Sequence, residues 1–226
     1  MPVPQPSLLP LFLILLPLLG TLFTVLFGWS KIRNGREINV LLILAVQCYG
    51  AIRVALKVFN GQVLESAGRS LVIDGLSGLM VLLVNLVVFL IVLYSIRYLR
   101  HDVERGLITD ARLTLYYSLI LLFTGTMNWT VTTNHLVMLY VAMEGSTLAT
   151  ALLVAFYRNK ASLEAGFKYV LLVVVGMTFA LFGIILIFAA AYPILGSSGL
   201  YLTEVGRIAR VIPKNIALLG IAFMTV

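Results

Sequence analysis

Long runs of hydrophobic residues, separated by short polar stretches, dominate this 226-residue chain. A helix needs about 20 mostly apolar residues to cross a bilayer. Runs of that length predict helices over Leu8–Phe27, Ile38–Val58, Leu76–Arg97, Leu113–Val131, Leu136–Tyr157 and Leu163–Tyr192. A further run from Ile216 to Val226 is too short to cross, so we expect the chain to end within a seventh span. The pattern predicts an all-α, polytopic transmembrane helix bundle.

Composition supports a membrane protein. Hydrophobic residues make up 61% of the chain and charged residues 11%, against about 45–50% and about 25% in soluble domains. These values exclude a soluble enzyme, a disordered chain and a secreted disulfide scaffold. The leader Met1–Ser7 carries no Lys or Arg, so the first run is predicted to remain as a helix rather than to be cleaved as a signal peptide.

The basic residues between the runs predict how the helices are oriented. Ten fall on one side of the membrane: Lys31, Arg33, Arg36, Arg97, Arg100, Arg105, Arg112, Arg158, Lys160 and Lys168. Five fall on the other: Lys57, Arg69, Arg207, Arg210 and Lys214. Because Lys and Arg accumulate in cytoplasmic loops, the first side is predicted to be cytoplasmic and the N-terminus to lie outside. The net charge of +7 therefore indicates a lipid bilayer and no nucleic acid as partner.

The stretch Asn60–Asp74 differs in kind from the other loops. Asn60-Gly61 is typical of a tight turn, and Ser70–Ile73 is aliphatic and β-branched. We expect a short hairpin on the outer surface, followed by Asp74 as the N-terminal cap of the third helix.

Glu144 is the most informative polar residue, because inserting an ionisable group into a span costs roughly 2.5–3.5 kcal/mol. It lies eight residues after Leu136, about 12 Å along the helix and close to the bilayer midplane. Tyr140 and Thr147 share its face of the helix, whereas no basic residue does. Two hypotheses fit, a neutral carboxyl hydrogen-bonded for packing and a protonatable group on an ion path. Intramembrane carboxyls favour the second.

Lys168 and His135 each allow a structural and a functional interpretation. Lys168 follows Glu164 by four residues near the cytoplasmic end of its span, so it forms an i,i+4 pair with a snorkelling stem or takes part in a proton path. His135 opens the fifth span near the outer surface, where a lone histidine is more often structural than a relay. Arg53 and Lys57, near the outer end of the second span, are explained by snorkelling.

Motifs for other chemistries are missing from the sequence. It has no GxxxxGK[ST] phosphate loop, no GxGxxG dinucleotide turn and no CxxC cluster. The single Cys48 can form neither an internal disulfide nor such a cluster. We therefore expect no catalytic redox residue, no cofactor and no metal ligand in this chain.

Several blocks of sequence resemble one family of membrane subunits. Residues 134–148 read NHLVMLYVAMEGSTL. This block resembles the fifth-helix signature of the antiporter-like subunits of respiratory complex I and of group-4 membrane-bound hydrogenases, most closely the hydrogenase-4 component F branch. Residues 148–158 (LATALLVAFYR), 164–169 (EAGFKY) and 180–183 (ALFG) are similar to the same branch. Upstream, 73–77 (IDGLS) and 94–98 (YSIRY) resemble the start and end of the family's third helix.

This resemblance implies an antiporter-like subunit of about fourteen helices with two inverted five-helix repeats. The chain is then expected to hold the first six helices and part of a seventh. Residues 1–112 would be the N-terminal helices 1–3, with the outer hairpin near 60–74, and residues 113–226 the start of the first proton-translocating repeat. Glu144 matches the fifth-helix glutamate, whose lysine partner on the seventh helix lies beyond Val226, and Lys168 matches a lysine at the start of the sixth helix.

The function implied is proton translocation in a redox-driven complex of the hydrogenase-4, formate hydrogenlyase or NADH-quinone oxidoreductase type. Its proton pathway would include Glu144, Lys168, Tyr140, Thr147 and His135. The expected partners are other membrane subunits and a peripheral redox arm, in the inner (cytoplasmic) membrane of the cell. Two alternatives stay open, a subunit of a multisubunit Na⁺/H⁺ antiporter and a truncated, non-conducting membrane anchor.

Overall fold

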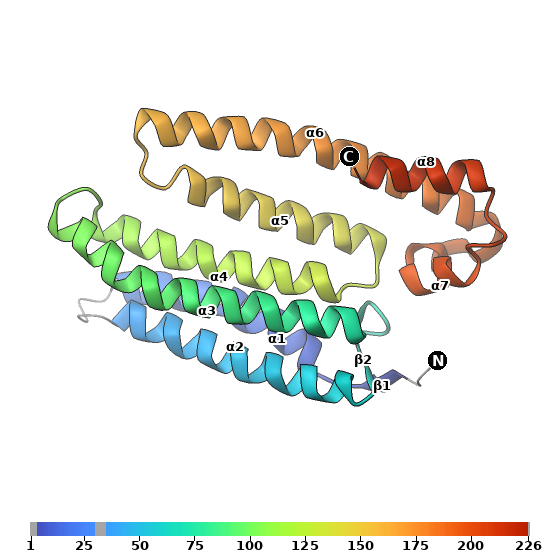
Figure 1. Cartoon of the computed structure of the whole chain (residues 1–226), viewed down its shortest axis with the longest axis horizontal. Coiled ribbons are helices and arrows are strands. Elements are labelled where there is room, and N and C mark those ends of the chain that lie inside the picture. Colours follow the sequence, from blue (N-terminus) through green and yellow to red (C-terminus); the bar gives the residue numbers. More distant parts are fainter. Residues whose placement is uncertain (1–3, 30–34, 226) are drawn as a thin grey trace.

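The computed structural model of the chain describes residues 4–29 and 35–225. Long helices run side by side in an elongated bundle (Figure 1). They are α1 (Leu9–Trp29), α2 (Gly35–Phe59), α3 (Gly75–Glu104), α4 (Asp110–Thr132), α5 (Leu136–Val154) and α6 (Lys160–Leu195). A 3-10 turn (Gly196–Leu200), the short α7 (Leu202–Arg207) and α8 (Lys214–Met224) follow. The predicted all-α membrane bundle is confirmed.

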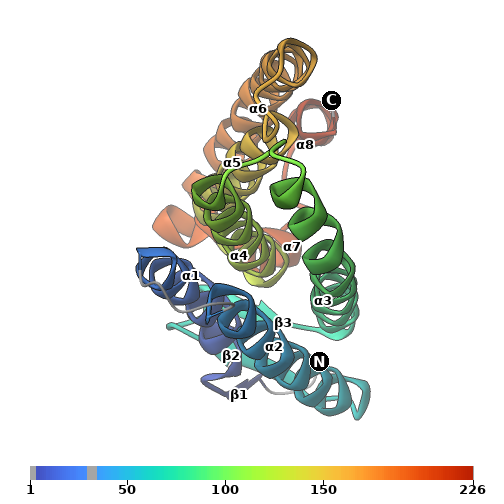
Figure 2. The same ribbon diagram turned by 90° about the vertical axis from the view of Figure 1, so that its left-hand side faces the viewer.

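The helices differ in how apolar they are. Within the described ranges, α1, α2, α3, α5 and α6 are the five helices that are long and apolar enough to cross a membrane. The run expected at Leu113–Val131 forms α4, which lies alongside them but is more polar. Its buried polar side chains are Ser118, Thr124, Thr126, Asn128 and Thr132. Figure 2 shows α4 among the other helices, and it packs against α1, α2, α3 and α5. These neighbours bury its polar side chains.

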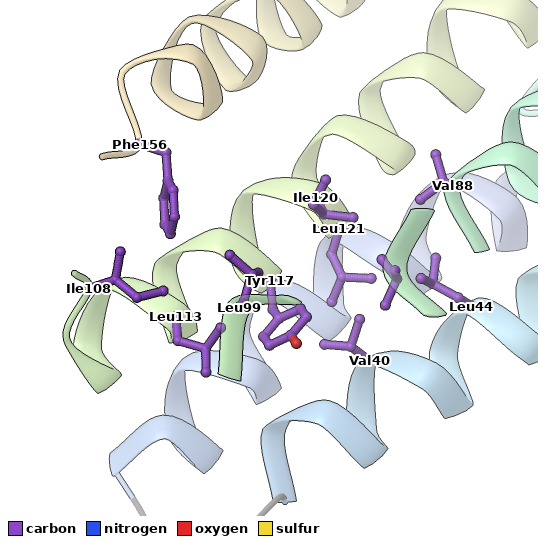
Figure 3. Close-up of a cluster of buried hydrophobic side chains, with 11 residues drawn as sticks. Val40, Leu44, Val88, Leu99, Ile108, Leu113, Tyr117, Ile120, Leu121 and Phe156 are labelled. Atoms are coloured by element: carbon purple, nitrogen blue, oxygen red, sulfur yellow. The ribbon is translucent and has the colours of Figure 1, made fainter. Parts of the chain in front are cut away.

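A hydrophobic cluster holds α2, α3 and α4 together (Figure 3). Its buried members include Val40 and Leu44 from α2, Leu99 from α3, and Leu113 and Tyr117 from α4. Tyr117 has no exposed surface and is the largest of the fully buried side chains. Its neighbour Tyr116 makes edge-on contacts with the rings of both Tyr117 and Phe156, so the cluster continues beyond the end of α5.

Pro17 lies inside α1 and creates a need for hydrogen-bond donors from other helices. Proline has no backbone N–H, so it cannot donate to the carbonyl of Leu13, four residues earlier. Gln47 of α2 donates its Nε2 to that carbonyl at 2.7 Å, and Asn128 of α4 donates its Nδ2 at 3.2 Å. Asn128 and Asn85 of α3 also exchange hydrogen bonds between their amides, at 2.9 and 3.2 Å. This fully buried amide cluster of Gln47, Asn85 and Asn128 joins α1, α2, α3 and α4.

The predicted hairpin is present between α2 and α3. Strand β2 (Val63–Ser66) pairs antiparallel with β3 (Leu71–Ile73). The turn between them holds Ala67, Gly68 and Arg69 at φ values of 51°, 60° and 73°. The Asn60-Gly61 turn instead leads from α2 into β2, with Gly61 at a φ of 82°.

Two local features complete this part of the fold. Asp74 caps α3 as expected, because its Oδ1 accepts from the backbone N–H of Ser77 at 2.8 Å. A third strand, β1 (Pro4–Pro6), pairs in parallel with β2. Sequence reasoning missed β1 because its two prolines lack ladder donors, which is tolerated only at a sheet edge.

Asn134, in the short connection from α4 to α5, ties three loops together. Its backbone N–H donates to the Ser70 carbonyl at 2.8 Å, and its side-chain Nδ2 donates to the Arg69 carbonyl at 3.0 Å. The same Nδ2 donates to Thr203 Oγ1 at 3.0 Å, and the Thr203 N–H donates back to Asn134 Oδ1 at 3.1 Å. We call this end of the bundle, with the β-strands, residues 133–135 and α7, the hairpin end.

The amide cluster leads to a prediction about stability. In the full-length protein in detergent, Asn128→Leu should lower the free energy of unfolding by about 1–2 kcal/mol, because it removes a donor to the Leu13 carbonyl and the donor to Asn85 Oδ1. The loss should be smaller in a Pro17→Ala background, where residue 17 can donate to the Leu13 carbonyl. Thermal and denaturant unfolding of the four proteins measures this coupling.

Thr21→Val is the matched control, since the Thr21 hydroxyl donates only within α1, to the Pro17 carbonyl at 3.0 Å. It should change stability little. Equal losses from Asn128→Leu with proline and with alanine at position 17 would contradict the role given to the freed carbonyl.

Candidate functional site

Glu144 lies midway along α5. The residue is half-buried, but its Oε2 atom is fully enclosed and has no hydrogen-bond partner among the described residues. The ion pairs found in residues 4–29 and 35–225 do not include it. An ionised carboxylate with an unpaired oxygen is costly in such surroundings. The structure therefore places at Glu144 a buried carboxyl oxygen that the described residues leave without a partner.

The side of α5 that carries Glu144 packs against α6. Glu144 precedes Ala151 by seven residues and Ala155 by eleven, so the three share one side of the helix. A Cβ added at Gly166 of α6 would lie 2.9 Å from Ala155 Cβ and 3.4 Å from the Ala151 carbonyl. Glu144 therefore lies on the side of α5 that contacts α6 near the turn between these two helices.

The opposite side of α5 packs against α4 through small residues. Ala142, Ser146 and Ala149 are buried there, and the missing side chain of Gly145 allows a close approach to α4. A Cβ at Gly145 would lie 2.9 Å from Thr126 Cγ2 of α4. These small side chains fix α5 on α4 and thereby hold Glu144 toward α6.

Helical spacing places Tyr140 and Thr147 on the same side of α5 as Glu144. Their side chains nevertheless make no hydrogen bond to the Glu144 carboxyl among the described residues. The Thr147 hydroxyl donates to the Glu144 backbone carbonyl at 2.9 Å, not to its carboxyl. Tyr140 is half-buried.

Lys168 lies in the first part of α6 and is paired within its own helix. Its Nζ lies 2.6 Å from Glu164 Oε1, and both side chains are mostly exposed, at 68% and 57%. The contact of Gly166 with Ala151 and Ala155 sets the register of the antiparallel pair α5 and α6. In that register Lys168 lies about 10 Å along the bundle from Glu144. The structure does not bring these two residues together.

His135 is the N-terminal cap of α5 and has a structural role at the hairpin end. Its Nδ1 accepts from the Met138 N–H at 3.5 Å, as a helix cap. Its ring meets the Tyr201 ring edge-on, with centroids 5.4 Å apart. The backbones of His135 and Tyr201 also form a β-bridge. His135 is nine residues from Glu144, about 13 Å along the axis.

A network of buried charges at the opposite end, which we call the charged end, was missed by the sequence analysis. Glu37 of α2 has only 5% of its side chain exposed, and Arg100 of α3 binds it with two nitrogens. Arg100 was assigned to a loop in the sequence analysis because the third span was expected to end at Arg97. Helix α3 in fact continues to Glu104. This ion pair, with Glu37 buried and Arg100 42% exposed, joins α2 to α3.

A second part of the charged end centres on Asp102, which is 5% exposed. The Tyr157 hydroxyl donates to Asp102 Oδ2 at 2.7 Å and lies 2.9 Å from the Tyr98 hydroxyl. Burial and the hydrogen bond to Asp102 raise the pKa of Tyr157, so its phenol stays protonated and remains a donor. A signal for Asp102 was present, because it continues the buried positions Val92, Ser95 and Leu99 at helical spacing.

Two segments of the chain, residues 66–106 and 133–226, match families of NADH:quinone oxidoreductase subunits. The family described as "NADH-Ubiquinone oxidoreductase (complex I), chain 5 N-terminus" matches residues 66–106. The family described as "NADH:quinone oxidoreductase/Mrp antiporter, TM" matches residues 133–226, which include Glu144 and Lys168.

Individual relatives point the same way. The hydrogenase-4 component F homolog of Methylacidiphilum infernorum (isolate V4) is 35% identical over 132 residues, 58% of this chain and 28% of that protein. The Na(+)/H(+) antiporter subunit A1 of Staphylococcus aureus (strain bovine RF122 / ET3-1) is 28% identical over 183 residues, 80% of this chain and 22% of that protein. The chain therefore spans less than a third of either relative.

A solved structure shares the fold. A chain of the membrane-bound sulfane sulfur reductase, described as an archaeal respiratory membrane complex, matches with a TM-score of 0.78 at 21% identity. The match covers 96% of this chain and 43% of that chain. The helix arrangement described above is thus the arrangement found in part of that larger subunit.

The close approach of α4 and α5 leads to a second prediction. Gly145→Ala should destabilise the full-length protein by about 1–3 kcal/mol, because the added methyl overlaps Thr126 Cγ2. Thr126→Ser removes that methyl and keeps the hydroxyl, which donates to the Leu122 carbonyl at 2.9 Å. The double variant should therefore recover most of the loss in thermal unfolding. No recovery in the double variant would show that another contact limits this packing.

Proposed function

Because the chain belongs to the superfamily of antiporter-like membrane subunits found in NADH:quinone oxidoreductases and Mrp antiporters, we propose that it contributes to proton translocation in a redox-driven membrane complex. The observation that carries this proposal is the enclosed, unpaired carboxyl oxygen of Glu144, midway along a membrane helix and inside the matched transmembrane region. Redox chemistry would belong to partner subunits.

The chemistry follows from the surroundings of Glu144. In its neutral form the carboxyl avoids the cost of an unpaired charge between α5 and α6. A cation that approaches the carboxyl favours the ionised form, so the proton leaves, and withdrawal of the cation favours its return. Alternation between these states, with access to opposite sides of the membrane, moves a proton. The small-residue contact of α5 with α4 holds the carboxyl in place throughout.

The other predicted residues take different parts in this proposal. Tyr140 and Thr147 lie on the same side of α5 as Glu144, where they border the route to the carboxyl. Lys168 is paired with Glu164 and mostly exposed, which suits a supporting charge near the membrane surface. His135 caps α5, which suits a role in building the hairpin end. We also propose that residues 1–112 form the N-terminal helices and that residues 113–226 begin the proton-translocating repeat.

The test replaces Glu144 in the full-length protein within its complex. Glu144→Gln should reduce proton pumping by about tenfold or more while the complex still assembles, because an amide cannot bind and release a proton. Glu144→Asp should keep part of the activity, since a shorter carboxyl remains. Pumping is measured with a pH-sensitive dye inside proteoliposomes.

Glu104→Gln is the matched control for loss of a carboxyl, because Glu104 is 79% exposed at the end of α3. It should pump at the wild-type rate. Wild-type pumping by Glu144→Gln would reduce Glu144 to a packing residue and remove the basis of the proposal.

A second candidate function is that of a subunit of a multisubunit Na⁺/H⁺ antiporter. The similarity to the Staphylococcus aureus antiporter subunit over 80% of this chain favours it. The two functions differ in what drives transport. Proton movement that requires Na⁺ on the opposite side and no electron donor would select the antiporter.

The orientation in the membrane is also a proposal, based on the excess of basic residues at the charged end. We propose an inner-membrane protein with its N-terminus outside and the charged end in the cytoplasm. In a Cys48→Ser background, Leu107→Cys lies in the loop after α3 and Val211→Cys in the loop before α8. Both side chains are exposed, at 56% and 68%. In intact cells an impermeant maleimide should label residue 211 and not residue 107, and the reverse pattern would refute the orientation.

A further inference from the structure

The last turns of α3 carry a groove on the outer surface of the bundle. Its volume is about 830 Å³, and its lining includes Tyr94, Arg97, Tyr98, Arg100, His101 and Glu104 together with aliphatic side chains of α3. Basic, aromatic and aliphatic side chains thus meet at one end of a helix apolar enough to cross the membrane. The groove lies at the charged end and on a different helix from Glu144.

The positive charge in the groove is available to an anion. Arg97 is exposed and forms no ion pair with residues 4–29 or 35–225. The undescribed residues 30–34 contain no Asp or Glu. Arg100 uses Nε and Nη2 to bind the buried Glu37, which holds its guanidinium in place, and its Nη1 has no hydrogen-bond partner among the described residues. Glu104, the one acidic residue of the lining, lies 3.9 Å from His101 Nδ1.

The exposed side of α3 also changes character along its length. Leu83, Leu86 and Leu90 are at least half exposed, Tyr94 is 78% exposed, and Arg97 follows. Leu83 and Arg97 are fourteen residues apart, about 21 Å along the helix. Half of a bilayer's hydrocarbon core is about 15 Å thick, with the headgroups beyond it. The apolar, aromatic and cationic sections therefore match the depths of acyl chain, interface and phosphate in one leaflet.

We propose that this groove binds an anionic phospholipid. The headgroup phosphate is held by Arg97 and by the free edge of Arg100, Tyr94 and Tyr98 border the glycerol region, and the acyl chains lie along Leu90 and the residues before it. Guanidinium forks suit phosphate oxygens. A free phosphate ion would use only the cationic end of this surface, whereas a lipid uses its whole length. The inference does not depend on proton translocation.

The experiment uses the full-length protein in detergent, titrated with phosphatidylglycerol or phosphatidylcholine and followed by native mass spectrometry. Phosphatidylglycerol should bind more tightly, and Arg97→Gln should weaken its binding about fivefold, the effect of one basic residue near an anionic lipid surface. Arg97→Lys should keep most of the binding because the charge remains. Excess inorganic phosphate should not displace the lipid.

Arg105→Gln is the matched control, because Arg105 is exposed just after α3 and outside the groove lining. It should bind phosphatidylglycerol as the wild type does. Equal binding of the two lipids, an equal loss in Arg105→Gln, or displacement by phosphate would overturn the proposal. In the intact complex a photoreactive side chain at Tyr94 should label lipid, and labelling of a neighbouring subunit would also overturn it.

Discussion

A backbone carbonyl that lacks a hydrogen bond is expensive inside a bilayer, where no water is present to replace the missing donor. Pro17 leaves the Leu13 carbonyl of the first helix without its usual donor, and side chains from the neighbouring helices supply the missing hydrogen bonds. The donors come from α2 and α4, and α3 joins through the paired amides of Asn85 and Asn128. Hydrophobic attraction does not select one helix arrangement within lipid, whereas directional hydrogen bonds and close packing do. The position of α4, and of α5 upon it, follows from this arrangement.

The sequence was sufficient for the helices, the hairpin and the cap of α3, because hydrophobic run length, β-branched composition and a capping aspartate are local signals. It was not sufficient for the contacts between helices. Gln47, Asn85 and Asn128 each stand in a predicted span, but their partner is a carbonyl whose loss of a donor shows only when Pro17 is counted within α1. Glu37 and Arg100 were missed because the second span was expected to begin at Ile38 and the third to end at Arg97, whereas α2 begins at Gly35 and α3 ends at Glu104.

Glu144 was found from the sequence for the same reason that it stands out in the structure, since a lone carboxyl within an apolar helix needs an explanation. Its surroundings were harder to predict. Helical spacing puts Tyr140 and Thr147 on its side of α5, but spacing does not say that the Thr147 hydroxyl turns back to the helix backbone. The pair of Lys168 with Glu164, one of the two interpretations that the sequence allowed, is present. Glu37 at the charged end and Glu204 at the hairpin end each contact an arginine, whereas no ion pair within residues 4–29 and 35–225 includes Glu144.

Asn134 sets an order of events during synthesis. Its side chain bonds to Arg69, made before it, and to Thr203, made 69 residues after it. At about 5–20 residues per second, the ribosome needs several seconds to pass from Asn134 to Thr203. Helices α5 and α6 are made in that interval. Until then the amide has only half of its partners. The hairpin end is therefore completed only after α6 has been made.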